Sequence, residues 1–245
     1  MYTAKDLGYS VYEQGSGRLD LAWEQWPIVG VTPASVSLGM FTSEPTASAA
    51  LTFFTEDSST HNVTLSASLN DVITDTDDSD SVTLTPASFA VSAAGEVEVN
   101  LNIDLSTLAA SFYSGRVIAT VDGISTIHAI FGFAKMREVT VHKTDINGEP
   151  ARGHLVWVLI DSPIQGVWEE WQETDESGDF TFYAADGNYH VVSPNWGHEE
   201  NQVTIWTVAE NVAISTDRGI SLDERNTKAV DFDPNKAGQV AASKS

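Results

Sequence analysis

Polar and apolar residues alternate along several short segments of this chain, and this period of two restricts the possible folds more than any other feature. Residues 96–103 are Glu-Val-Glu-Val-Asn-Leu-Asn-Ile, an unbroken alternation. Such a pattern is typical of a β-strand with one buried and one solvated face. Other β-rich runs occupy 50–54, 63–67 and 115–121, with polar loops between them. The chain is therefore predicted to be all-β, and its one helical candidate is a turn over 105–112.

The spacing of these strands predicts two consecutive antiparallel β-sandwiches after a short non-β segment at 1–26. About seven strands in roughly 100 residues is the density of an immunoglobulin-like or fibronectin-III-like sandwich, which we assign to 27–134. A hairpin is expected there at Asp122-Gly123. The second sandwich is assigned to 135–215. Residues 216–245 lose the alternation and are predicted to be a linker or the start of a further module.

Turn residues define the second sandwich. Residues 145–150, Asp-Ile-Asn-Gly-Glu-Pro, should reverse the chain between a strand at 138–144 and a returning strand at 154–160. Later strands are expected at 179–183, 187–192 and 202–207.

Composition excludes several kinds of partner and chemistry. The 12 basic and 35 acidic residues give a net charge of −23, which repels phosphate backbones, so nucleic acid is not expected as a partner. No apolar run approaches the ~20 residues that span a bilayer, so membrane insertion is not expected. A chain with no cysteine has no disulfide, thiolate metal site or cysteine nucleophile. The first residues lack the features of an export signal, so either the protein is cytoplasmic or Met1 is not its native start.

One short motif precedes the first sandwich. Residues 14–20, Gln-Gly-Ser-Gly-Arg-Leu-Asp, resemble the segment that ends the catalytic domain of subtilisin-like serine proteases, where Ala often replaces Ser16. The resemblance implies that 1–26 is the tail of such a domain. The alternative is a loop followed by a helical turn, with Leu19, Leu21 and Ala22 forming a short apolar element.

A second resemblance covers about 137–210. The strand and turn at 140–153, together with 174–182 and 187–191, are similar to carboxypeptidase-regulatory-like, transthyretin-like sandwiches. The order of these parts is similar to the C-terminal half of long extracellular subtilases. It implies secreted accessory modules that stabilise or space a serine endopeptidase domain, with that domain as partner and with a polysaccharide or protein substrate as a further partner.

Two other functions stay open on the sequence alone. One is a stand-alone secreted protein for carbohydrate binding or adhesion, and the other is a structural assembly subunit. All of these functions rest on analogy of fold, which does not determine function.

No peptidase chemistry is expected of the chain itself. A subtilase triad needs Asp, His and Ser in Asp-x-Gly, His-Gly and Gly-Thr-Ser-Met-Ala contexts. The sequence contains none of these with the family's surroundings. The six histidines also lack the spacing of a zinc site. The chain is therefore predicted not to be an enzyme, and no cofactor is expected other than calcium.

An acidic run at 74–80 is the candidate calcium site. Alternating carboxylates in a loop can supply the oxygen ligands of calcium, and the candidates are Asp75, Asp77, Asp78 and Asp80. The EF-hand pattern fails there. A solvated hairpin loop whose charges protect a sheet edge is the favoured alternative.

Tryptophans concentrate in the second sandwich. Trp168, Trp171 and Trp196 lie in polar surroundings and are candidates for binding sugar rings. Trp157 and Trp206 lie in apolar strands and are expected in the core. The alternative is that the first three fold onto the end of the sandwich, since large aromatic residues are mostly buried.

Lys143 lies in the first strand of the second sandwich. Adhesin sandwiches with spontaneous Lys–Asn isopeptide bonds have a lysine at such a position, and they also need a buried acid and a late asparagine. The acid is expected shortly after Tyr189, where Val or Ser stands instead. The sequence therefore does not predict this bond.

Overall fold

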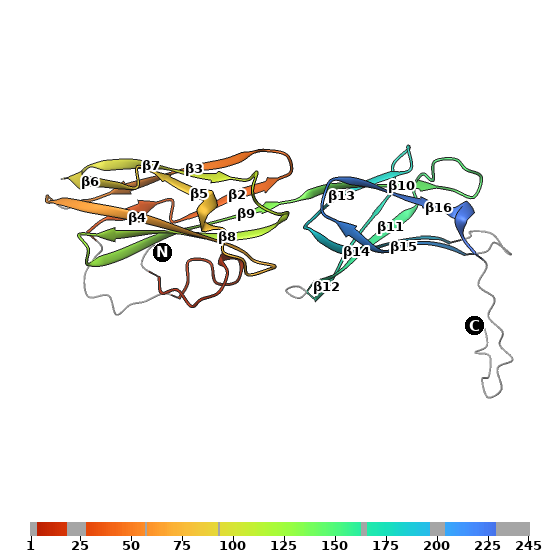
Figure 1. The fold of residues 1–245 in the computed structure, drawn as a ribbon, viewed down its shortest axis with the longest axis horizontal. Coiled ribbons are helices and arrows are strands. Elements are labelled where there is room, and N and C mark those ends of the chain that lie inside the picture. Colours follow the sequence, from red (N-terminus) through yellow and green to blue (C-terminus); the bar gives the residue numbers. More distant parts are fainter. Residues whose placement is uncertain are drawn as a thin grey trace, which may run out of the picture.

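The computed structural model describes residues 4–18, 28–56, 58–92, 94–162, 166–196 and 204–228. The protein is all-β in its main body, and its strands form two sandwiches that lie end to end (Figure 1). The apolar element expected at Leu19, Leu21 and Ala22 lies outside the described residues. Within the described ranges, no helix reaches the length and apolarity needed to cross a membrane.

The first sandwich consists of a four-stranded and a five-stranded sheet. In spatial order the smaller sheet contains β1 (Gly30–Thr32), β3 (Thr46–Phe54), β7 (Glu96–Asp104) and β5 (Val82–Thr85). The larger contains β2 (Ser35–Phe41), β9 (Ser125–Lys135), β8 (Ser111–Val121), β4 (Thr60–Asp71) and β6 (Ser88–Ser92). All neighbours are antiparallel except β2 and β9.

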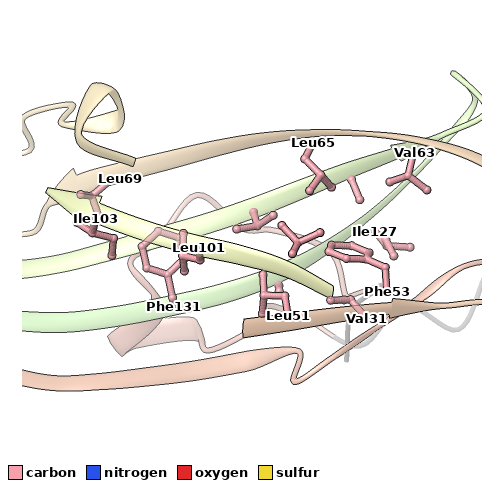
Figure 2. Close-up of a cluster of buried hydrophobic side chains, with 14 of the residues drawn as sticks. Val31, Leu51, Phe53, Val63, Leu65, Leu69, Leu101, Ile103, Ile127 and Phe131 are labelled. Carbon is pink, nitrogen blue, oxygen red and sulfur yellow. The ribbon is translucent and has the colours of Figure 1, made fainter. Parts of the chain in front are cut away.

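The alternation in the sequence matches the two faces of these sheets. In β7 the apolar residues Val99, Leu101 and Ile103 are buried and the polar residues between them are exposed. Figure 2 shows Leu101 and Ile103 in one cluster with side chains of β3, β4 and β9. The predicted hairpin is confirmed, because β8 and β9 pair through Val121 and Ser125.

The second sandwich consists of a three-stranded and a four-stranded sheet. In spatial order the smaller contains β13 (Asp179–Ala184), β10 (Arg137–Thr144) and β16 (Arg218–Asp223). The larger contains β12 (Gly166–Glu173), β11 (Leu155–Ser162), β14 (Gly187–Asn195) and β15 (Ile205–Ile214). Val139, Val141, Val156, Val158 and Phe182 lie at the centre of its core.

Three expectations about local structure need correction. Residues 105–112 form no helix, because Leu105 and Leu108 are buried at the end of the core and β8 begins at Ser111. The helical segments in the described ranges are α1 (Val11–Gln14) and the 3-10 turns η1 (Ser79–Ser81) and η2 (Glu224–Asn226).

The turn at 145–150 forms, with Gly148 at φ +89°, but it does not make a hairpin. It connects β10 and β11, which lie in different sheets. The segment 216–245, predicted as a linker or the start of a further module, contributes β16, which pairs in parallel with β10. The boundary expected at 215 therefore falls inside the second sandwich.

Residues 4–18 fold back onto the outer face of β8 and β9. The Val11 amide donates to Ser114 Oγ at 2.9 Å, and Tyr12 Oη donates to the Phe133 carbonyl at 2.8 Å. Lys5 and Arg18 close this segment through two backbone hydrogen bonds of 2.8 and 2.9 Å. The Gln-Gly-Ser-Gly-Arg part of the motif is therefore held against the first sandwich.

A short joint connects the two sandwiches. Met136 is the single residue between β9 and β10, and it is buried. Asp186, in the turn before β14, accepts hydrogen bonds from Arg137 Nε at 2.8 Å and from the Ala110 amide at 3.3 Å. The Asp186 amide donates to the Ala110 carbonyl at 2.8 Å. Contacts from both sandwiches thus restrain the joint.

Candidate functional site

Tryptophans gather on the outer face of the larger sheet in the second sandwich. Trp171 is the register partner of Trp157 across β12 and β11, and Trp206 is the register partner of Pro194 across β15 and β14. The Trp206 ring contacts two other indole rings edge to face. Its centroid lies 6.1 Å from that of Trp157 and 5.2 Å from that of Trp196. Rings from three strands and the end of β14 therefore meet on one surface.

We call this surface the aromatic face and define it as Trp157, Trp171, Trp196, Trp206 and Val208. Exposed fractions are 63% for Trp171, 48% for Trp196, 45% for Trp206 and 48% for Val208. Buried core residues contact the opposite face of the same strands. Because folding normally covers such aromatic area, this exposed patch is a candidate interaction surface.

The alternation of β11 and β15 explains why these rings point outward. Val156 and Val158 flank Trp157 and are buried, so Trp157 occupies the opposite face and is only half-buried. Thr207, beside Trp206, is buried in the same way. The expectation that Trp157 and Trp206 belong to the core was therefore wrong for Trp206 and only partly right for Trp157.

Two of the three tryptophans predicted to bind sugars lie on this surface. Trp171 and Trp196 belong to the aromatic face. Trp168 is the register partner of Ile160 across β12 and β11. Its side chain lies outside the described part of the structure. The sequence signal that places Trp157 and Trp206 on the aromatic face is the alternation of inward and outward side chains along β11 and β15.

The acidic run at 75–80 forms a turn next to β4. Asp77 Oδ1 accepts a hydrogen bond of 3.0 Å from the Ser79 amide, and bonds from Ser79 lower the pKa of Asp77. Burial and the charges of Asp71 and Asp77 raise the pKa of Asp78. Among the residues that the structure describes, no group of three or more His, Asp or Glu side chains is arranged to hold a metal ion. A calcium site at Asp75, Asp77, Asp78 and Asp80 stays a prediction.

A polar cluster lies inside the second sandwich. Lys143 is buried, and its Nζ lies 3.1 Å from Glu224 Oε1. Nζ also donates to Thr207 Oγ1 at 3.1 Å and to the Ser193 carbonyl at 3.4 Å. The Glu224 carboxylate receives a further hydrogen bond of 3.1 Å on Oε2 from Asn195 Nδ2.

Two neighbours complete the electrostatics of this cluster. His154 Nδ1 lies 3.4 Å from Glu224 Oε1. Burial lowers the pKa of Lys143, and the nearby Glu224 opposes that shift. Burial, followed by the charge of Lys143, lowers the pKa of His154. A buried lysine with a lowered pKa is a candidate nucleophile, although structural ion pairs shift pKa values as well.

Sequence reasoning missed the acid of this cluster. The acid was expected shortly after Tyr189, whereas Glu224 follows β16, which pairs with β10 beside Lys143. The backbone of Lys143 is fixed there, because its amide donates to the Gly178 carbonyl at 2.8 Å and its carbonyl accepts from the Ala151 amide at 3.0 Å. The signal for this acid in the local sequence was the alternation in which Ile220, Leu222 and Glu224 occupy every second position, and all three are buried.

No protein-family model matches the sequence, and no curated protein matches it. Solved structures match at low identity. A family 123 glycoside hydrolase from Clostridium perfringens is 13% identical with a TM-score of 0.36, over 42% of this chain and only 23% of that chain.

Two further matches are chaperone-like or PapD-like. The ASH / PapD-like domain of human CEP192 is 11% identical with a TM-score of 0.35, over 44% of this chain and 84% of that one. The periplasmic chaperone SfaE is 10% identical with a TM-score of 0.31, over 79% and 99%. Similarities at this level concern the sandwich fold alone, so the resemblance to subtilases remains a prediction.

Proposed function

We propose that this chain is a non-catalytic, secreted binding region that holds a polysaccharide or a glycan-coated surface on its aromatic face. The observation that carries the proposal is the exposure of Trp171, Trp196 and Trp206 on one sheet surface. Indole rings offer flat apolar area with a polar N–H at the edge. Sugar rings present apolar C–H faces and a polar rim, so the two surfaces are complementary.

The sandwich supports this role mechanically. Trp157, Trp171 and Trp206 are attached to paired strands, and Trp196 directly follows the end of β14. Sites on strands keep their geometry better than sites on loops. A rigid array loses little conformational entropy when it binds a ligand.

A panel of soluble and insoluble polysaccharides tests the proposal, with tryptophan fluorescence and pull-down as readouts. Truncation of a central tryptophan costs about 2 kcal/mol or more, which is more than a tenfold loss of affinity. We expect such a loss for Trp171→Ala and for Trp206→Ala. Tyr183→Ala is the matched control, because Tyr183 is 44% exposed on β13, in the other sheet. The proposal fails if no polysaccharide changes the fluorescence of the unmodified protein.

We also propose that this binding region serves a subtilisin-like serine protease domain. The docking of residues 4–18 on β8 and β9 supports this attachment, because a domain that continued into this segment would be fastened to the first sandwich. The coding sequence directly upstream tests it. A Gly-Thr-Ser-Met-Ala segment is expected there, whereas a signal peptide immediately before residue 1 would support a stand-alone adhesion protein. Self-assembly in light scattering would support an assembly subunit instead.

A further inference from the structure

Three side chains that can react with one another meet inside the second sandwich. Lys143 Nζ lies 3.1 Å from Glu224 Oε1, and both side chains are fully buried. The other oxygen of the same carboxylate accepts the hydrogen bond from Asn195 Nδ2. Glu224 therefore lies between an amine on β10 and a carboxamide on β14, which belong to opposite sheets.

The amine is held on the side of β14 that carries the carboxamide. Lys143 Nζ donates to the carbonyl of Ser193, which is two residues before Asn195 on the same strand. Residues separated by two on a strand share a face, so Ser193 and Asn195 both lie on the inner face. Thr207 Oγ1 accepts a second bond from Nζ and in turn donates to the Ser193 carbonyl at 3.0 Å, which fixes the amine there.

The surroundings favour an unprotonated amine. Burial lowers the pKa of Lys143, and an amine becomes nucleophilic when it loses its proton. Transfer of that proton to Glu224 leaves two neutral groups, which an apolar interior tolerates better than two charges. Glu224 Oε1 makes no hydrogen bond of acceptable geometry within the described residues, although Nζ lies close to it. That oxygen is therefore available to take up and release a proton.

We propose that Lys143 and Asn195 form an intramolecular isopeptide bond, with Glu224 as the group that moves the proton. Nζ attacks Asn195 Cγ, the Nζ–Cγ bond forms and the Cγ–Nδ2 bond breaks. Glu224, which holds the first proton taken from Nζ, supplies it to the departing Nδ2 and takes up the second proton that Nζ loses as the new bond forms. Nδ2 leaves as ammonia. An amine and a primary amide thus become a secondary amide and ammonia, with no oxidant, reductant or co-reactant.

The bond would join the two sheets of the second sandwich covalently. The chain has no cysteine and so no disulfide that could do the same. A link between residues distant in sequence restricts the unfolded chain and stabilises the fold, as a disulfide does. The aromatic face lies on the sheet that contains Asn195, so the link would also support the proposed binding surface under load.

Isotopically resolved intact mass of the denatured chain tests the proposal directly. We expect a mass lower than the sequence mass by one ammonia, and a branched peptide that contains Lys143 and Asn195 after proteolysis. The full sequence mass would overturn the proposal. A loss of one water, with Lys143 linked to Glu224, would overturn the assignment of Asn195 as the partner.

Variants distinguish this reaction from another reaction that also releases ammonia. A succinimide at Asn147-Gly148 also releases ammonia, so an Asn147→Ala variant should keep the mass deficit and the branched peptide. Lys143→Met and Asn195→Ala should each restore the full mass expected for that variant. Glu224→Gln keeps the size of the side chain and should lose the branched peptide. A branched peptide at wild-type yield in Glu224→Gln would remove Glu224 from the mechanism. If these variants fail to fold, the mass of the unmodified chain still decides.

Discussion

Lys143 Nζ and Glu224 Oε1 lie 3.1 Å apart, and neither side chain is exposed to solvent. Removal of one member of a buried pair leaves an uncompensated charge, at a cost of about 3–5 kcal/mol. We expect Glu224→Leu to be less stable than Lys143→Met/Glu224→Leu by an amount of this order. Both variants lack the carboxyl group that the cross-link needs, so the comparison isolates the buried charge. Urea unfolding at neutral pH measures the difference, and equal stability of the two variants would contradict it.

Local patterning predicted the fold class because burial on one face leaves a direct trace in the sequence. The eight residues at 96–103 became part of β7, with the apolar positions inward. The same logic identified β10, where Val139 and Val141 are buried. Turn chemistry was less informative. The Asn147-Gly148 turn formed, but whether the next strand pairs with β10 or crosses to the other sheet depends on packing at a distance.

The candidate sites were harder to predict because they depend on long-range pairing. Glu224 lies beside Lys143 only because β16 aligns in parallel with β10, and no local signal specifies that partner. For the tryptophans, the apolar character of a strand predicts that every large ring is buried. The alternation of side chains along β15 instead places Trp206 on the outer face. Both faces of β15 carry apolar residues, so hydrophobicity alone cannot assign them.

The N-terminal segment should detach more readily without one hydroxyl group. Tyr12 Oη donates to the carbonyls of Phe133 and Tyr113 at 2.8 and 3.1 Å. Loss of a typical intramolecular hydrogen bond costs about 0.5–1.5 kcal/mol. Tyr12→Phe should therefore speed hydrogen exchange at the amides of Lys5 and Arg18, which close the segment. Tyr9→Phe is the control, since Tyr9 is 62% exposed, and equal exchange in both variants would count against the prediction.

Gly115 leaves space for a core ring. It is the register partner of Phe131, and a Cβ on residue 115 would collide with the Phe131 ring. Overpacking of this kind costs about 1–3 kcal/mol, so Gly115→Ala should lower the free energy of unfolding by that amount. At Gly187 a new Cβ would meet its nearest neighbours at 3.6 and 3.7 Å, in ordinary contact. Gly187→Ala should therefore be close to neutral, and thermal unfolding of the two variants compares them.

Acidification should weaken the second sandwich through His154. Burial, with a further contribution from Lys143, lowers the pKa of His154. Below about pH 6.5, the usual histidine value, the unfolded chain binds protons that the folded chain does not. The free energy of unfolding therefore falls as pH decreases from that value toward the folded pKa. Urea unfolding across this range should show a smaller decrease in His154→Asn than in the unmodified protein. The same slope in both would exclude this cause.

The orientation of the two sandwiches should depend on Asp186. Its carboxylate accepts bonds from Arg137 Nε and Nη2 at 2.8 and 3.2 Å, both within the second sandwich, and from the Ala110 amide in the first. Asp186→Ala removes these bonds and leaves the backbone bond to Ala110. We therefore expect a broader distribution of orientations, with each sandwich still folded.

Energy transfer between two dyes measures this distribution. The chain has no cysteine, so cysteines introduced at Ile124 and Ile146 would be the only labelling sites. These residues are 89% and 53% exposed and lie in loops of different sandwiches. The width of the distance distribution should increase in Asp186→Ala. Asp217→Ala is the matched control, because Asp217 accepts from the Glu138 amide at 3.0 Å and both residues belong to the second sandwich. An unchanged width in Asp186→Ala would show that the one-residue connection at Met136 holds the orientation without the carboxylate.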